Sequence, residues 1–209
     1  MAALLLNDGA DLEAKDPNAQ RPLHQASMKG FSEIVKQLLD HGAEVDARGD
    51  LGRTALHLAV VNGDHTATQL LVAQGSSIAA CDVGEWTALY IAVSKGHAAL
   101  TRFLVDQGAD IDARDSYGAT ALYRSAEIGD VDIARMLIER GSKLDVTNNI
   151  DQSALHRAAE LGYLAVTKVL LEHGADFKSK DSYGWAPSHG VAEQGHEEVA
   201  KHLSGFRCT

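Results

Sequence analysis

The chain has 209 residues, of which 45% are hydrophobic and 23% charged, a balance typical of folded proteins rather than disordered ones. Its formal net charge of −10 argues against DNA or RNA as the main partner, because nucleic-acid binding needs Lys and Arg to neutralise phosphates. No apolar run reaches the ~18 residues of a membrane span, no secretory signal is recognisable, and two cysteines do not make a disulfide framework. These features predict a cytoplasmic or nuclear protein that is not secreted and has no nucleic-acid or membrane partner.

A pattern with a period of 33 residues runs along almost the whole chain. One column, spaced by that period, holds histidine or tyrosine: His24, His57, Tyr90, Tyr123, His156 and His189. A second column holds only glycine: Gly30, Gly63, Gly96, Gly129, Gly162 and Gly195. Repetition at a period of 20–50 residues is typical of solenoids and other repeat architectures.

Each period carries the signals of two short helices. The first helix is expected to begin after a hydroxyl residue that caps it, at Thr54, Thr87, Thr120 and Ser153. Glycine then separates it from a second helix, whose apolar residues, such as Ile133, Leu137 and Ile138, recur along one stripe. Helices this short are not stable alone in water, so stability has to come from stacking of neighbouring repeats.

The sequences "TALHLA" at 54–59, "TALYIA" at 87–92 and "SALHRA" at 153–158 resemble the T-P-L-H-x-A signature of the ankyrin-repeat family. The resemblance implies an all-α solenoid of stacked helix-turn-helix units with β-turn fingers and a concave groove. The register predicts these segments: a partial N-terminal repeat at 1–15 (second helix and loop), repeats at 16–48, 49–81, 82–114, 115–147 and 148–180, and a C-terminal capping repeat at 181–209. Because the register begins inside a repeat, we expect either a piece of a longer array or a start with a half-repeat cap, and the alternative is a divergent N-terminal cap.

The conspicuous histidines do not predict a metal site or a catalytic centre. In ankyrin proteins the histidine of the repeat column forms hydrogen bonds locally and to the neighbouring repeat, so the resemblance implies a structural role for it. The segment "HEEVAKH" at 196–202 lacks the second zinc ligand of an H-E-x-x-H helix, because Ala200 stands at that place. We therefore expect no metal, no cofactor, no catalytic residue and no enzymatic activity.

Binding residues are expected where the repeat varies, and the resemblance to ankyrin proteins implies that these places are the turn tips and the exposed side of the first helix. Several tips carry large apolar side chains that the fold does not require, and such residues are typical interface anchors. The predicted partner-binding residues are Leu51, Arg53, Trp86, Tyr117, Glu127, Ile128, Ile150, Glu160, Leu161, Tyr183 and Trp185. The alternative is that each aromatic side chain only shields a neighbouring finger.

The helix side adds a row of acidic residues, Glu127, Glu160 and Glu193. We therefore expect a monomer that binds another protein or peptide, with an apolar stripe and basic residues on the partner. The alternative is that these charges form only a solvated face.

Two tyrosines, Tyr90 and Tyr123, replace the column histidine in adjacent repeats, and Arg124 follows the second. These three residues suggest a groove pocket for a small molecule or an atypical enzymatic site, whereas local repacking is the simpler explanation. A third hypothesis is that the chain is a structural segment of a larger ankyrin array.

Overall fold

The computed structural model describes residues 11–205, apart from the side chain of Glu193. The helix predicted within residues 1–15 falls largely outside this range. The regular secondary structure of the described part is helical, as predicted, and its one β-bridge joins Cys81 to Thr87. None of its helices is long and apolar enough to cross a membrane.

The chain divides into two compact units after Ala109. The first unit contains the helices α2 (Pro22–Lys29), α3 (Ser32–Asp40), α4 (Ala55–Val61), α5 (His65–Ala73), α6 (Ala88–Ser94) and α7 (Ala98–Asp106), with a short 3₁₀ turn η1 (Asp50–Gly52). The second contains α8 (Ala121–Ile128), α9 (Val131–Glu139), α10 (Ala154–Glu160), α11 (Leu164–Glu172), α12 (Pro187–Gln194) and α13 (Glu197–Gly205).

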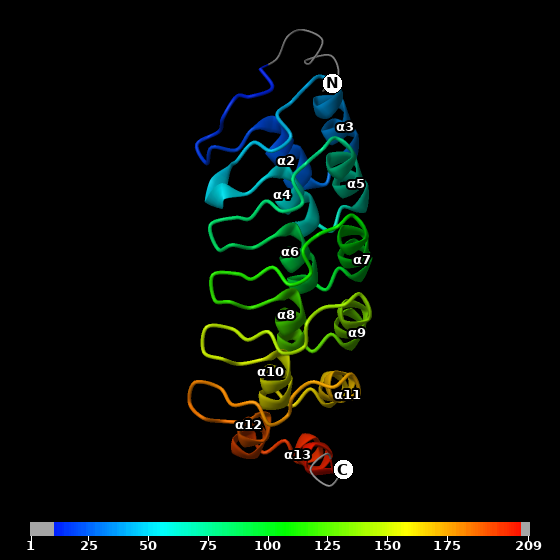
Figure 1. Ribbon diagram of the computed structural model, residues 1–209. Coiled ribbons are helices and arrows are strands. Elements are labelled where there is room, and N and C mark those ends of the chain that lie inside the picture. Colours follow the sequence, from blue (N-terminus) through cyan, green and yellow to red (C-terminus); the bar gives the residue numbers. More distant parts are fainter. Residues whose placement is uncertain (1–10, 206–209) are drawn as a thin grey trace. The chain divides into compact units, whose positions relative to one another are not determined.

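Each unit is a stack of antiparallel helix pairs. In the first unit α2, α4 and α6 pack in sequence, and α3, α5 and α7 form the layer beside them. In the second unit α8, α10 and α12 form one layer and α9, α11 and α13 the other. Within each unit of Figure 1 the hairpin-like fingers extend on one side of the first helices and the second helices lie on the opposite side. This arrangement confirms the predicted all-α fold of stacked helix-turn-helix units.

Local hydrogen bonds explain where the first helices begin and end. The hydroxyl oxygens of Thr87 and Thr120 each accept a bond of 3.2 Å from the backbone amide three residues later, as the predicted caps require. Gly129 ends α8 with φ of 74°, a left-handed conformation that side chains disfavour. A Cβ atom there would also lie 2.8 Å from the ring of Tyr163, so both the backbone and the packing require glycine.

The fingers are narrow turns that bond to one another. In the finger that precedes α12, Asp181 Oδ1 accepts bonds from the amides of Tyr183 and Trp185 at 3.0 and 2.9 Å. The amide of Ser182 donates to the carbonyl of Ile150 in the preceding finger at 3.1 Å. The backbone of each finger is thereby fixed, which leaves the side chains at its tip available.

Leucines that precede the histidine column form the core. Their exposed fractions do not exceed 2%, and they are Leu23, Leu56, Leu89, Leu122 and Leu155. In the second helices the predicted stripe is buried at Ile133 and Leu137 but only half-buried at Ile138.

The column histidines connect successive repeats, as the family resemblance implied. His57 Nε2 lies 3.1 Å from the carbonyl oxygens of Ala80 and of Trp86 in the next finger, while its Nδ1 accepts a bond from the Thr54 amide. His24 and His156 make the corresponding Nε2 contacts. Because Nδ1 is an acceptor and Nε2 faces carbonyl groups, this network requires the neutral imidazole.

We expect the protein to lose stability when the pH falls below the ordinary histidine pKa of about 6.5. Burial lowers the pKa of His24, His57 and His156, so the folded state binds fewer protons than the unfolded state in this range. Their contribution to stability is complete above the unfolded-state pKa and is lost as the pH falls toward the folded-state values. Urea denaturation followed by circular dichroism at about pH 7.5 and pH 5.5 measures the effect, and an unchanged midpoint would contradict it.

Candidate functional site

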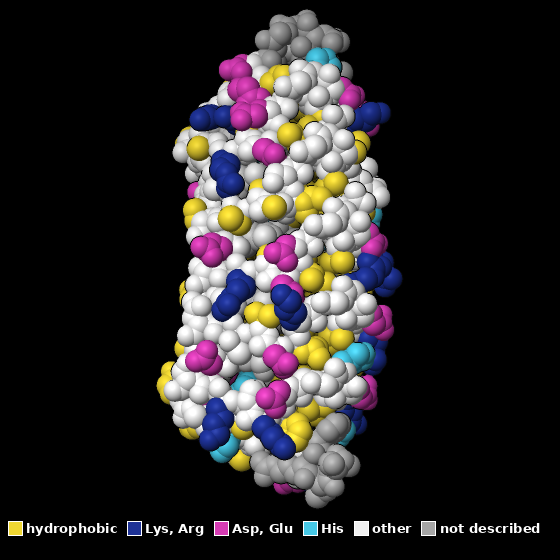
Figure 2. All heavy atoms as spheres, viewed as in Figure 1, with side chains coloured by type: hydrophobic (Ala, Val, Ile, Leu, Met, Phe, Trp, Pro, Cys, Tyr) yellow, Lys and Arg dark blue, Asp and Glu magenta, His cyan; other side chains and the backbone are white. Residues whose placement is uncertain are grey.

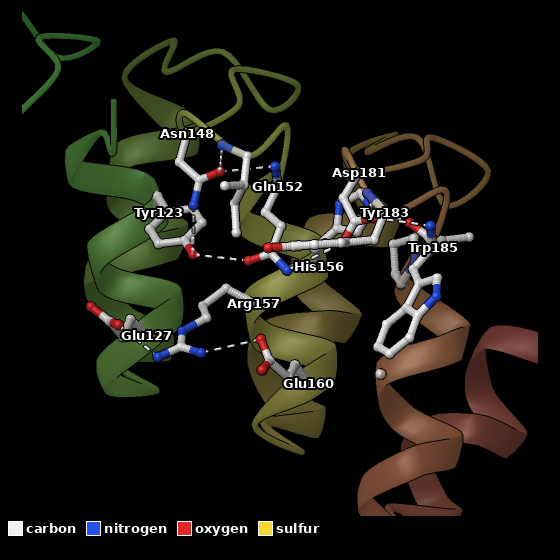
Figure 3. A pocket seen from close by; sticks show the side chains of 14 residues that line it. Tyr123, Glu127, Asn148, Gln152, His156, Arg157, Glu160, Asp181, Tyr183 and Trp185 are labelled. Atoms are coloured by element: carbon white, nitrogen blue, oxygen red, sulfur yellow. Dashed lines mark hydrogen bonds and ion pairs between the residues drawn. The ribbon is translucent and has the colours of Figure 1, made fainter. Parts of the chain in front are cut away.

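A hollow of about 440 Å³ opens on the second unit, beside the fingers and first helices (Figure 3). Residues from α8, α10 and α12 and from the fingers before α10 and α12 line it. Six of the residues predicted from the sequence are among them: Tyr123, Glu127, Ile150, Glu160, Tyr183 and Trp185. The structure therefore brings together five of the eight partner-binding residues predicted in the second unit with one of the two pocket tyrosines.

A chain of side-chain hydrogen bonds crosses the finger side of the hollow (Figure 3). Asn148 Nδ2 donates to the Tyr123 hydroxyl at 3.1 Å, and that hydroxyl donates to Gln152 Oε1 at 3.4 Å. Gln152 Nε2 then donates to Asp181 Oδ2 at 3.3 Å. Tyr123 thus bonds to the side chain of the next finger, whereas the column histidines bond to its backbone.

Tyr123 has no acid–base role near neutral pH. Burial raises the pKa of its phenol to about 12, an effect that nearby Arg157 opposes and nearby carboxylates reinforce. Its hydroxyl is therefore a neutral hydrogen-bonding group of the wall.

Two members of the predicted row of acidic residues, Glu127 and Glu160, are paired with arginines. Arg157 Nη2 lies 2.8 Å from Glu127 Oε1 and its Nη1 lies 3.1 Å from Glu160 Oε2, while Arg124 pairs with the other oxygen of Glu127. Burial alone would raise the pKa of Glu127, but the bonds from Arg157 and Arg124 lower it. Figure 2 likewise shows acidic and basic side chains interspersed over the visible face, without a continuous area of either sign.

The rim of the hollow is aromatic and exposed. Tyr183 is 70% exposed, Trp185 44% and Ile150 39%, and the rings of Tyr183 and Trp185 lie 6.5 Å apart between centroids. Tyr117 is 73% exposed at the tip of the finger before α8, outside the lining of the hollow. Exposed aromatic groups next to a concavity are typical of interface anchors.

The predicted residues of the first unit do not line this hollow. Leu51 is 50% exposed, but Arg53 Nε forms an ion pair of 3.0 Å with the buried Asp82. Trp86 is half-buried, with its ring 5.2 Å from that of Tyr90 between centroids. Trp86 thus packs against a residue of its own repeat, and Tyr90 is almost fully buried.

The remaining predicted residues lie at the margins of the second unit's first helices. Ile128 is the last residue of α8 and Leu161 caps the end of α10, and both are half-buried. Arg124 pairs with Glu127 and is not part of the lining. Of the three residues of the predicted groove pocket, Tyr123 is the one that lines this hollow.

Several lining residues were missing from the predicted site. Asn148, Arg157 and Asp181 place polar atoms in the hollow, and Gly190 of α12 lies against Glu160. Asn148 and Asp181 belong to a column of finger residues that recurs every 33 residues. This recurrence indicated a structural role and not a binding role. The feature of the sequence that could have identified Arg157 as a lining residue was its position directly after the histidine column, where Arg124 stands in the preceding repeat.

Comparison with known proteins agrees with this architecture. The family model for ankyrin repeats in three copies matches residues 1–82, 62–148 and 140–208. The ankyrin repeat domain of human ASB11 is 25% identical with a TM-score of 0.88, covering 97% of this chain and 95% of that one. The ankyrin repeat domain of Bcl-3, a member of the IkappaB protein family, is 26% identical with a TM-score of 0.84, covering 96% and 90%.

No curated protein sequence matches the chain significantly. Ankyrin-repeat domains generally act as protein-interaction modules and are generally not enzymes. On the strength of the family match along its length, this chain belongs to the ankyrin-repeat family.

Proposed function

We propose that the second unit binds a peptide or folded protein partner at the hollow, with Tyr183 and Trp185 as its anchors. The single observation that carries this proposal is the exposure of both rings beside a concavity of about 440 Å³. Their backbone amides bond to Asp181 and so stabilise the finger, whereas these bonds do not involve their side chains. Burying large exposed aromatic groups is a major source of binding free energy.

The other residues predicted from the sequence extend this surface. Ile150 adds an apolar edge to the hollow, and Tyr117 offers a further exposed ring in the same unit. Ile128 and Leu161 flank the helix side. In the first unit Leu51 is a separate exposed contact, whereas Arg53 and Trp86 would contribute only the parts of their side chains that Asp82 and Tyr90 leave accessible.

A small-molecule site in the same hollow is the second candidate, because its volume lies within the usual range of ligand pockets. The chemistry supports it less well. The hydroxyl of Tyr123 is neutral and already bonded to Asn148 and Gln152, and Arg157 is held by two carboxylates.

We expect the double variant Tyr183→Ala/Trp185→Ala to lose at least about 30-fold in affinity for peptides selected on the wild-type protein. A phage-displayed library of random peptides provides the ligands, and fluorescence polarisation of the selected peptides measures their affinity. Phe31→Ala is the matched control, because that ring is 53% exposed and lies on the first unit. Circular dichroism checks that the helices persist. Selected peptides that bind the double variant as tightly as the wild type would contradict the proposal.

A further inference from the structure

We propose that the hollow receives the side chain of a lysine from the bound partner, with its ammonium group at Glu160 Oε1 and its aliphatic stem against Trp185 and Tyr183. This inference rests on the proposed function and specifies the partner chemistry that the site would select.

The charge of the lining favours a cation. Three carboxylates, those of Glu127, Glu160 and Asp181, share the lining with a single guanidinium, that of Arg157. His156 adds no charge near neutral pH, because burial lowers its pKa. Bonds from the Trp185 amide and from Gln152 lower the pKa of Asp181 against the effect of burial, so this carboxylate stays ionised. The hollow is therefore net negative even though its acidic row is partly paired.

One carboxylate oxygen in the hollow remains without a partner in the described part of the chain. Arg157 and Arg124 occupy both oxygens of Glu127, and backbone amides and Gln152 occupy both oxygens of Asp181. At Glu160, Arg157 takes Oε2 and leaves Oε1. The Glu160 side chain is 36% exposed, so solvent reaches part of it.

A single free oxygen selects lysine over arginine. A guanidinium binds a carboxylate best through two parallel bonds, which need both oxygens. Arg157 already occupies one of them, whereas an ammonium group acts as a point charge that one oxygen can accept.

The apolar part of the hollow fits the stem of the same residue. Figure 3 shows the Glu160 carboxylate and the Trp185 indole on opposite sides of the lower part of the hollow. Gly190 of α12 faces Glu160 without a side chain, and an added Cβ would stand 3.4 Å from Glu160 Cβ. Because Glu160, Tyr183 and Trp185 all line the hollow, a lysine bound there would have both the carboxylate and the aromatic rings as neighbours. Cation–π attraction would add to the ion pair where the ammonium group comes within about 6 Å of a ring.

The experiment uses a minimal probe, the N-acetyl N-methylamide of lysine, titrated into the intact ¹⁵N-labelled chain. The corresponding norleucine and arginine derivatives are the comparisons. The chain has two tryptophans, so the indole N–H signal of Trp185 reports on the hollow and that of Trp86 is the internal reference. We expect the lysine probe to shift the Trp185 signal saturably and to leave Trp86 unchanged. The norleucine and arginine probes should bind about threefold to tenfold more weakly.

Glu160→Gln should remove the preference for lysine over norleucine, because it removes the charge and keeps the shape. Glu172→Gln, a change of an exposed residue on α11, is the matched control and should retain the preference. Equal shifts with lysine and norleucine, equal binding of arginine, or no shift at Trp185 would each overturn the inference. These results would not contradict the proposed function if the binding of the selected peptides still depended on Tyr183 and Trp185. In that case the selected peptides are expected to have no lysine in common.

Discussion

Replacing Leu155 with alanine is expected to lower the free energy of unfolding by about 2–5 kcal/mol. Leu155 in α10 is completely buried, in the layer where α10 packs against both α8 and α12. The change removes buried methyl groups and leaves a cavity that neighbouring helices on both sides can only partly fill. Because each repeat is stabilised by its neighbours, the loss affects two interfaces at once.

Urea denaturation followed by the helical circular dichroism signal measures this effect. Leu164→Ala is the matched control. Leu164 is half-buried at the start of α11, so its replacement should lower the free energy of unfolding by less. Equal losses for the two variants would show that the leucine column does not carry the core of the second unit.

The columns of the sequence predicted the fold well because the same contacts recur in every repeat. Leu155 and His156 occupy the same environment as Leu56 and His57, so periodicity alone identified them as core and connector. The glycine column was equally informative, because the chain adopts a left-handed conformation where the two helices of a repeat meet. Gly129 is an example.

The site was predicted less completely because its specific contacts do not recur. Arg157 reaches Glu127 across 30 residues, and nothing in the spacing shows that this arginine neutralises the acidic row. Conversely, Asn148 and Asp181 repeat as finger residues, and the repeat does not show that Asn148 also bonds to the Tyr123 hydroxyl or that Asp181 also bonds to Gln152.

The two tryptophans illustrate the same limit. Trp86 and Trp185 stand in one column, three periods apart, and were expected to behave alike. Trp86 packs on Tyr90, four residues later, and becomes half-buried. The residue four places after Trp185 is His189, which is itself exposed and smaller, so the second indole keeps a face open to solvent. The tip aromatic that has a tyrosine four places later is thus the less exposed of the two.

Replacing His57 with alanine is expected to destabilise the protein by about 2–5 kcal/mol at neutral pH. His57 is completely buried, and its imidazole satisfies the Thr54 amide and two carbonyl groups, those of Ala80 and Trp86. Without the ring these polar groups stay buried without a partner, and the connection between α4 and the next finger is lost. Chemical denaturation at about pH 7.5 measures the change.

The same column provides the control for His57. His189 is exposed, and its ring accepts a bond from the Ala186 amide close to the end of the described chain. His189→Ala should therefore lower the free energy of unfolding by less than about 1 kcal/mol. The His57 variant should also show a smaller loss of stability between about pH 7.5 and pH 5.5 than the wild type, because it lacks one of the three buried imidazoles that must be protonated. A His57→Ala variant with wild-type stability and an unchanged pH dependence would contradict the assignment of this column as the hydrogen-bonded connection between repeats.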